Sequence, residues 1–368
     1  MQSAANPILD RKPLDVPGAG PRLRQTPVVV GRLLLGLGGL FLCLSPWLLD
    51  ANSLQISTQF LCLVTVALMW NVLAGYADIM TLGQHMFVGL GAYAFFGMVS
   101  LGGMHPYLAI FTAGAVALVF AIPVMFVVFR LRAAYLAVGT WVVAEVFLLI
   151  AGRIPQFGLG TGISLPLSVA RPFGSDASTR AVTVYVFALV IAMTAYLATW
   201  FLLRSRLGIG LTAIRDNEEA ASALGVDLVK ARILAFLWTA PFLGMIGAIV
   251  ALQKMRISPQ ASFSFLDWTV FVIFIVVIGG IGSLEGPIIG AVIYLVLREY
   301  LGDLGTWYLI ALGSISIIVM LIEPKGVWAL LRRYIGQDII PVSHRSDSAF
   351  GDTKRYPRPD ESVICKSR

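Results

Sequence analysis

Apolar and polar positions alternate in blocks along this chain of 368 residues. Long apolar runs are separated by short polar connections, and a helix needs about 20 apolar residues to cross a bilayer. The pattern predicts about ten crossings, near Gly31–Leu49, Ser53–Ala74, Met80–Leu101, Pro106–Phe129, Tyr135–Ala151, Ala181–Leu203, Ala231–Gln253, Asp267–Leu284, Pro287–Leu301 and Leu304–Ile322. The third run is rich in glycine and the ninth is short, so a re-entrant segment is the alternative to a crossing at both.

Composition strengthens the prediction of a membrane protein. Hydrophobic residues make up 58% of the chain and charged residues 13%, whereas a soluble domain carries about 25% charged residues. The mean hydropathy is +0.85. A water-soluble fold cannot bury so much apolar surface, so we predict an all-α polytopic membrane protein with about 8–10 transmembrane helices.

Polar segments flank the apolar region at both ends. Residues 1–27 are rich in Pro, Gly and charge and are predicted to form a disordered cytoplasmic tail. Residues 28–331 form the predicted transmembrane domain, and residues 332–368 a cytoplasmic C-terminal tail. About thirty mostly polar residues precede the first apolar run, so the N-terminus lacks the form of a cleaved signal peptide and we expect it to be retained.

The placement of basic residues indicates the orientation. The net charge is +7, and Lys and Arg lie at the ends of predicted spans and in the tails, which indicates cationic cytoplasmic loops rather than nucleic-acid binding. With both termini in the cytoplasm, most of the 27 Lys and Arg residues lie inside, although the internal loops alone show a smaller bias. This orientation places the polar loop 204–230 in the cytoplasm.

That loop contains a predicted short helix. Asp216 is a candidate N-cap, with Glu219 three residues later as in a capping box, and Gly225 is a candidate C-terminal stop. A helix of roughly two turns is too short to be stable alone in water. It therefore folds back on its own protein or docks into a partner, and an ordinary cytoplasmic connector is the alternative.

Two predicted external connections are long enough for contact with a soluble partner. Gly152–Arg180 is the longest and contains a turn-rich run of glycines, and Met255–Leu266 combines Ser, Pro and Phe. A simple connecting role is the alternative for each.

The chain lacks the motifs of an enzyme. The glycine-rich stretch Gly279–Pro287 has no Gly-Lys-Ser/Thr ending with which to hold phosphate and Mg²⁺, so its glycines indicate helix packing or a turn. With three His residues and few acids, no nucleophile–base set or pair of catalytic carboxylates can be assembled, and the three Cys residues lack disulfide or metal-site spacing. We expect no catalysis, no metal and no cofactor.

Ionisable residues inside predicted spans are costly and are therefore candidates for function. Glu145 in the fifth span is interpreted either as a helix-pairing residue or as a pore residue. His85 in the third span is interpreted as an interhelical hydrogen-bond partner rather than a proton carrier. So few acidic residues disfavour a proton-driven carrier.

Four stretches, in order, resemble a known family. They are Leu82–Tyr93, Arg132–Glu145, Gly208–Gly225 and Val277–Pro287. In these stretches the chain is similar to the inner-membrane permease of branched-chain amino-acid ABC importers, of the LivM type. The third stretch, with Ala-Ile-Arg-Asp-Asn-Glu at 213–218, is the most specific, and the resemblance covers most of the chain from about residue 31 to 331.

The resemblance implies a division of labour in a bacterial inner membrane. A second permease subunit would complete the translocation pathway within membrane lipid, two cytoplasmic ATP-binding subunits would bind the inner loops, and a periplasmic substrate-binding protein would deliver branched-chain or similar small amino acids. The implied ATPase-coupling residues are Ala213, Arg215, Asp216, Asn217, Glu218, Glu219, Ala221 and Gly225. The candidates for pore lining or helix packing are His85, Glu145, Gly279, Gly280 and Gly282.

Two departures from the family pattern bear on the substrate. Asp78-Ile79-Met80-Thr81 stands where the family usually has a Gly-Gln-Val/Leu-Ser type sequence, and residues 85–87 (His-Met-Phe) are bulkier than usual. Relatives carry urea, short amides and other small polar solutes, so these are alternative substrates. An ion-coupled secondary transporter and a membrane enzyme are the alternatives of other classes.

Overall fold

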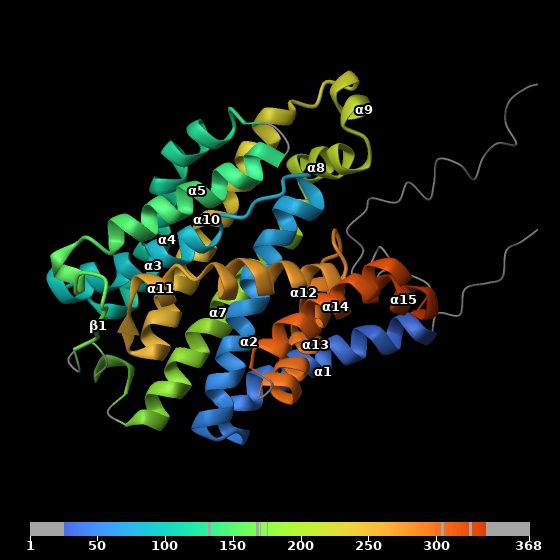
Figure 1. Ribbon diagram of the computed structural model, residues 1–368. Coiled ribbons are helices and arrows are strands. Elements are labelled where there is room, and N and C mark those ends of the chain that lie inside the picture. The colour runs from blue at the N-terminus through green and yellow to red at the C-terminus, as the bar shows by residue number, and fades with distance from the viewer. Residues whose placement is uncertain are drawn as a thin grey trace, which may run out of the picture.

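The computed structural model describes residues 26–131, 134–166, 169, 171–174, 176–302, 305–323 and 326–335 (Figure 1). The predicted tails fall outside the described residues except at their inner ends, as do Arg132 and Ala133 of the second family-like stretch. The described chain is almost entirely helical, which confirms the all-α prediction.

The elements follow one another in a simple order. The N-terminal half contains α1 (Thr26–Leu48), α2 (Ala51–Asn71) with the π-helical turn η1 (Val72–Tyr76), α3 (His85–Phe96) with η2 (Gly97–Leu101), α4 (Pro106–Val128), α5 (Ala134–Ala151), η3 (Pro155–Phe157), β1 (Ile163–Ser164) and η4 (Arg171–Phe173). The rest contains α7 (Ala177–Arg204), α8 (Arg206–Asp216), α9 (Glu218–Ala223), α10 (Leu228–Lys254), β2 (Arg256–Ile257), α11 (Pro259–Ser262), η5 (Leu266–Val270), α12 (Phe271–Gly279), α13 (Gly286–Leu301), α14 (Thr306–Ile322) and α15 (Gly326–Ile335).

A helix occupies each of the ten predicted apolar runs, but fewer are long enough to cross a membrane. In the described part of the chain, six segments have the required length and hydropathy: Ala51–Tyr76, Pro106–Val128, Ala134–Ala151, Ala177–Arg204, Leu228–Lys254 and Pro259–Gly279. A seventh forms if α14 and α15, bent by 43°, count as one span. The third and ninth runs are short helices, since the third begins only at His85 and α13 has 16 residues.

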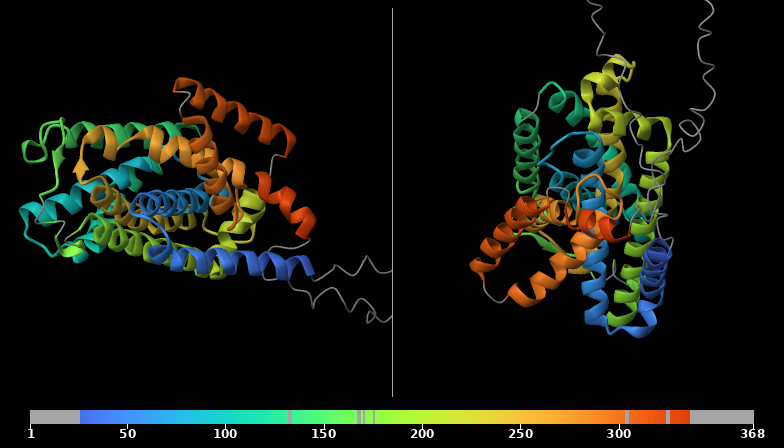
Figure 2. Two further views of the ribbon diagram at one scale, coloured as in Figure 1. Left: turned by 90° about the horizontal axis from the view of Figure 1, so that it is seen from below. Right: turned by 90° about the vertical axis from the view of Figure 1, so that its right-hand side faces the viewer.

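Helix α10 lies at the centre of the bundle, between α3, α4, α2 and α7. Small residues allow this close packing, as is usual between membrane helices. A side chain on Gly91 of α3 would collide with the carbonyl of Gly244 on α10, and one on Gly247 would collide with the carbonyl of Val88. Helix α5 is the least buried of the six candidate spans, since only 17% of its apolar stretch is buried. Figure 2 shows α13, α14 and α15 gathered at one side of the bundle.

Two polar surfaces of the protein lie beyond the opposite ends of α10. Helices α8 and α9 precede α10, and β2 follows it after 27 helical residues, a length of roughly 40 Å at 1.5 Å per residue. Strands β1 and β2 pair antiparallel, with Ile163 opposite Ile257. This small sheet joins the two predicted external connections, and Figure 1 shows it far from α9.

Candidate functional site

The polar loop between α7 and α10 contains two helices rather than the single predicted one. Ser205 caps the first, α8, by accepting a hydrogen bond from the Gly208 amide at 3.4 Å. Leu211 and Ile214 are buried, so α8 lies with its apolar face against the body of the protein. Helix α8 continues through Asp216, and α9 begins only at Glu218.

This arrangement corrects the prediction for the N-cap. Asp216 is the last residue of α8 and does not cap α9, so the predicted capping box with Glu219 is wrong. Asn217 is extended (φ −163°, ψ 108°), and its Oδ1 accepts a hydrogen bond from the Ala220 amide at 2.9 Å. The reason is that α8 holds Asp216 in a helical conformation, whereas a capping residue needs an extended one. Glu218 and Glu219 do lie in the first turn of α9, where the helix dipole favours acids.

Helix α9 rests on the protein by one face and presents the other to solvent. Ala221 is buried, whereas Glu219, Ser222 and Leu224 are exposed, Leu224 to 82%. Gly225 has φ +86°, the left-handed conformation of a glycine that ends a helix, which confirms the predicted stop. The helix is short but held at both ends, and an exposed leucine projects from its C-terminus.

Arg215 connects this loop to the turn between α12 and α13. Its Nε donates to Asp216 Oδ1 at 2.9 Å, and its Nη1 donates to the carbonyl of Gly282 at 3.4 Å. The guanidinium also lies over the ring of Tyr76, 5.6 Å from the ring centroid. The turn itself is bound to α2, because Asn71 accepts from the Gly282 amide and donates to the Ser283 carbonyl, both at 2.8 Å.

A second connection runs through Arg232, the fifth residue of α10. Its two Nη atoms donate to the two carboxylate oxygens of Glu218 at 3.0 Å each. Its Nε donates to the carbonyl of Ala77 at 3.1 Å, and Asp78 Oδ2 lies 3.7 Å from Nη2. Sequence reasoning missed Arg232, since no local spacing relates it to Ala77, which is 155 residues away.

The glycines at 279–282 serve packing and turn formation in the structure. A side chain on Gly279 would collide with the carbonyl of Gly286, so α12 and α13 approach closely there. Gly280 and Gly282 have φ of +127° and +75°, which favour glycine. The geometry is that of the predicted turn and close helix contact.

His85 and Glu145 have different surroundings. His85 is fully buried, and its Nδ1 lies 3.0 Å from Thr269 Oγ1 of η5, so it connects two elements as expected of an interhelical hydrogen-bond partner. Glu145 is half-buried on α5, and its Oε1 accepts a hydrogen bond from Trp141 of the same helix at 3.1 Å. Because this hydrogen bond lies within one helix, it does not join α5 to a neighbouring helix. Glu145 therefore stays a candidate for contact with a partner subunit or for lining a pathway.

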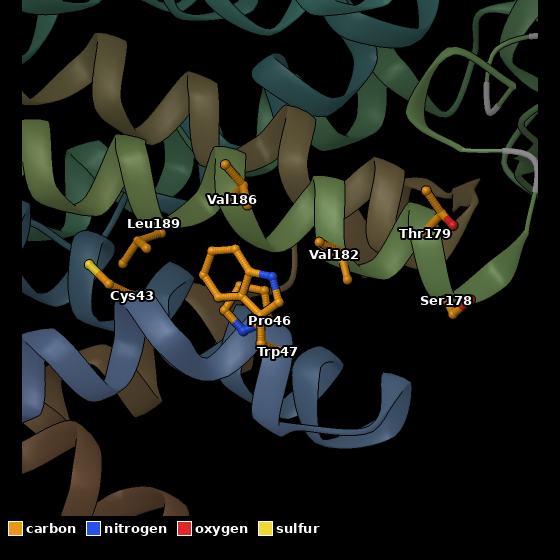
Figure 3. A pocket seen from close by; sticks show the side chains of 8 residues that line it. All are labelled: Cys43, Pro46, Trp47, Ser178, Thr179, Val182, Val186 and Leu189. Carbon is orange, nitrogen blue, oxygen red and sulfur yellow. The ribbon is translucent and has the colours of Figure 1, made fainter.

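A groove between α1 and α7 is mainly apolar. Figure 3 shows Cys43 and Trp47 of α1 facing Val182, Val186 and Leu189 of α7. Its volume is about 600 Å³, and among the described residues Ser178 and Thr179 alone line it with hydroxyl groups. None of its described lining residues is charged, whereas a zwitterionic solute needs charged partners. Among the described residues, no group of three His, Cys, Asp or Glu side chains is placed to hold a metal ion.

Comparison with known proteins identifies relatives of the whole membrane domain. The family model "Branched-chain amino acid transport system / permease component" matches residues 52–322. The chain is 29% identical over 309 residues to the high-affinity branched-chain amino acid transport system permease protein LivM of Salmonella typhimurium, covering 78% of this chain and 72% of that protein. It is 28% identical to LivM of Escherichia coli with the same coverage.

A more distant relative bears a different name. Over 148 residues the chain is 27% identical to the probable branched-chain amino acid transport permease protein LivH of Methanocaldococcus jannaschii, which covers 36% of this chain and 45% of that protein. No solved structure matches the chain significantly.

Proposed function

This chain belongs to the family of branched-chain amino acid transport system permease components, and on that premise we propose that it is one of two permease subunits of an ATP-driven importer. The importer also contains two cytoplasmic ATP-binding subunits and a periplasmic substrate-binding protein. The chain itself is a multi-pass membrane protein with several apolar spans. ATP is hydrolysed on the partner subunits, since the Gly279–Pro287 turn is a packing element without the lysine of a phosphate loop.

The observation that carries the proposal is the exposed face of α9. The helix has six residues, too few to be stable alone, yet it is capped by Asn217 and ends at Gly225. Leu224 stands 82% exposed at its end. A preformed helix that presents apolar surface binds a partner with little ordering cost. We assign the exposed side of residues 213–225, without the buried Ile214 and Ala221, as the docking surface for an ATP-binding subunit.

The translocation pathway runs along α5, where the second permease subunit packs. Helix α5 is mostly exposed in the single chain, and a carboxylate there is costly against lipid. Contact with a partner subunit or an aqueous pathway removes that cost for Glu145. Both termini and the docking surface lie in the cytoplasm, and β1–β2 lies on the external side, where the binding protein docks.

The proposed substrates are branched-chain or similar small amino acids. Residues 78–81 and 85–87 differ from the usual family sequence, so urea and short amides stay as alternative substrates. Asp78, one of these residues, lies beside Arg232 near the docking surface and not on α5. Docking on and off the ATP-binding subunits shifts the equilibrium between outward-open and inward-open states, because the docking surface makes different contacts in each.

Co-purification and transport together test the proposal. The tagged chain is expressed with its native partners, and the proteins that accompany it are identified. We expect a second permease and an ATP-binding subunit among them. Uptake of radiolabelled leucine into proteoliposomes should require ATP on the side of the membrane to which the cytoplasmic face of the importer points. Uptake that follows a proton or sodium gradient without ATP would instead support an ion-coupled secondary transporter. If the importer transports urea or a short amide with ATP but does not transport leucine, only the proposed substrate is wrong and the proposed transporter class stands.

A further inference from the structure

We propose that Arg232 is a positioning residue that transmits movement of the docking surface to the membrane domain through the connecting segment 77–84. The inference rests on the proposed function, because it concerns how docking of an ATP-binding subunit reaches the pathway. The connecting segment is the non-helical stretch between η1 and α3.

Arg232 joins three parts of the chain with one guanidinium. It binds both carboxylate oxygens of Glu218 at the start of α9, at 3.0 Å each, and the Ala77 carbonyl at 3.1 Å. The Arg232 side chain is 21% exposed and that of Glu218 45%, so solvent screens the pair in part. Arg232 itself is the fifth residue of α10, the central helix of the bundle. A shift of α9 therefore acts directly on Ala77.

The connecting segment is bonded to the membrane domain along its length. The Ile79 amide donates to the Leu73 carbonyl at 2.9 Å. Trp70 Nε1 of α2 donates to the Thr81 carbonyl at 2.9 Å. Asp78, beside Arg232, has φ +53°, an uncommon conformation for a residue other than glycine. Irregular backbone among membrane helices persists only where such partners satisfy it.

The far end of the segment contacts α5. The Leu82 amide donates to Thr140 Oγ1 at 3.0 Å, and a side chain on Gly83 would collide with the Thr140 carbonyl. The Leu82 carbonyl accepts from Thr269 Oγ1 of η5 at 3.3 Å. Thr140 lies five positions before Glu145 on the same helix. The path from the docking surface to the proposed pathway is thus continuous: Glu218, Arg232, Ala77, the connecting segment and α5.

Arginine is the residue that this junction requires. Its planar guanidinium presents donors in two directions, so it binds a carboxylate with two nitrogens and a backbone carbonyl with the third. Lysine carries the same charge on a single nitrogen and cannot reproduce the paired geometry. The other connection, from Arg215 to Gly282, has a single hydrogen bond of 3.4 Å and is more exposed.

The test uses the complete importer in proteoliposomes with leucine-loaded binding protein as the probe. Variants Arg232→Gln, Arg232→Lys and Glu218→Gln are compared with the matched control Lys230→Gln, which breaks the exposed Lys230–Asp227 pair in the same helical turn. We expect the leucine-stimulated increment of ATP hydrolysis, and uptake per ATP hydrolysed, to fall at least about fivefold in the three variants, in the usual range of coupling between sites. Lys230→Gln should behave as wild type.

The double variant Glu218→Gln/Arg232→Gln tests whether the two residues act as one unit, while uptake per ATP hydrolysed separates positioning from a merely structural role. Residues that act as one unit are non-additive, so the double variant should be no worse than either single variant. If Arg232→Gln does not accumulate in the membrane, Arg232→Lys takes its place, because it keeps the charge and loses the paired geometry. Wild-type coupling in Glu218→Gln, or additive losses in the double variant, overturns the inference. A wild-type complex that lacks ATP-binding subunits or shows no stimulation refutes the proposed function instead.

Discussion

Asn71 holds the turn at Gly282 through both polar atoms of its side-chain amide. Its Oδ1 accepts from the Gly282 amide, and its Nδ2 donates to the carbonyl of the next residue, both at 2.8 Å. Asn71 is fully buried on α2, and the turn lies 211 residues later between α12 and α13. One buried side chain thus holds together segments from the two halves of the chain, at the same turn whose Gly282 carbonyl accepts a hydrogen bond from Arg215.

Replacing Asn71 should destabilise the protein. Asn71→Ala leaves the half-buried Gly282 amide and Ser283 carbonyl without this partner, and an unsatisfied group costs up to about 1–3 kcal/mol when it is buried. The melting temperature of the purified protein in detergent should fall. Gln253→Ala is the control, since the hydrogen bond of Gln253 to the Gln55 carbonyl is exposed. Equal melting temperatures for the two variants would contradict the clamp.

Because Asn217 caps α9, its replacement should reduce coupling more than replacement of Asp216. Asn217→Ala removes the side chain that accepts from the Ala220 amide, and loss of an N-cap costs about 1 kcal/mol, or roughly fivefold in the population of the docked helix. Leucine-stimulated ATP hydrolysis should fall accordingly, with the amount of protein in the membrane unchanged. Asp216→Ala is the comparison variant: it lies in the same docking surface and loses an exposed ion pair, which contributes little, but it leaves the cap intact, so its loss of stimulation should be the smaller of the two. The assignment of the cap fails if Asp216→Ala is the more damaging of the two.

Leu224 should be needed for docking and not for folding. It is 82% exposed, so Leu224→Ser removes no contact of the single chain. Affinity for the ATP-binding subunit should weaken by about tenfold, the effect of losing roughly 1.4 kcal/mol at an interface. Leu159, 63% exposed beyond the opposite end of the bundle, supplies the control Leu159→Ser. Undiminished co-purification with Leu224→Ser would remove α9 from the interface.

Labelling from each side of the membrane tests the orientation. Single cysteines at Ser222 in α9 and Ser164 in β1 are both exposed and lie beyond opposite ends of α10. In a background without Cys43, Cys62 and Cys365, an impermeant reagent added outside should label position 164 only. Labelling of position 222 under the same conditions would reverse the orientation.

Hydropathy and a few local signals were sufficient to predict much of this protein. Each of the ten predicted apolar runs contains a helix, although only six segments of the described chain are long and apolar enough to cross a membrane, or seven if α14 and α15 count as one span. The transfer of a segment into an apolar environment depends mainly on its own residues. Gly225 ends α9 as predicted, because the left-handed conformation is a property of that residue and its neighbours. The four family-like stretches likewise predicted the family that the comparison identifies. These features are local and can be derived from the sequence.

Only the tertiary structure determined which distant segments meet and what each polar side chain does there. Asp216 is a good capping residue by type, but the continuation of α8 through it leaves the cap to Asn217. The third run begins its helix at His85 because Thr81 and Leu82 are bonded to α2 and α5 instead. Arg232 reaches Ala77 across 155 positions. Hydrogen bonds act over about 3 Å, so their partners depend on how the helices pack, which no local pattern in the sequence specifies.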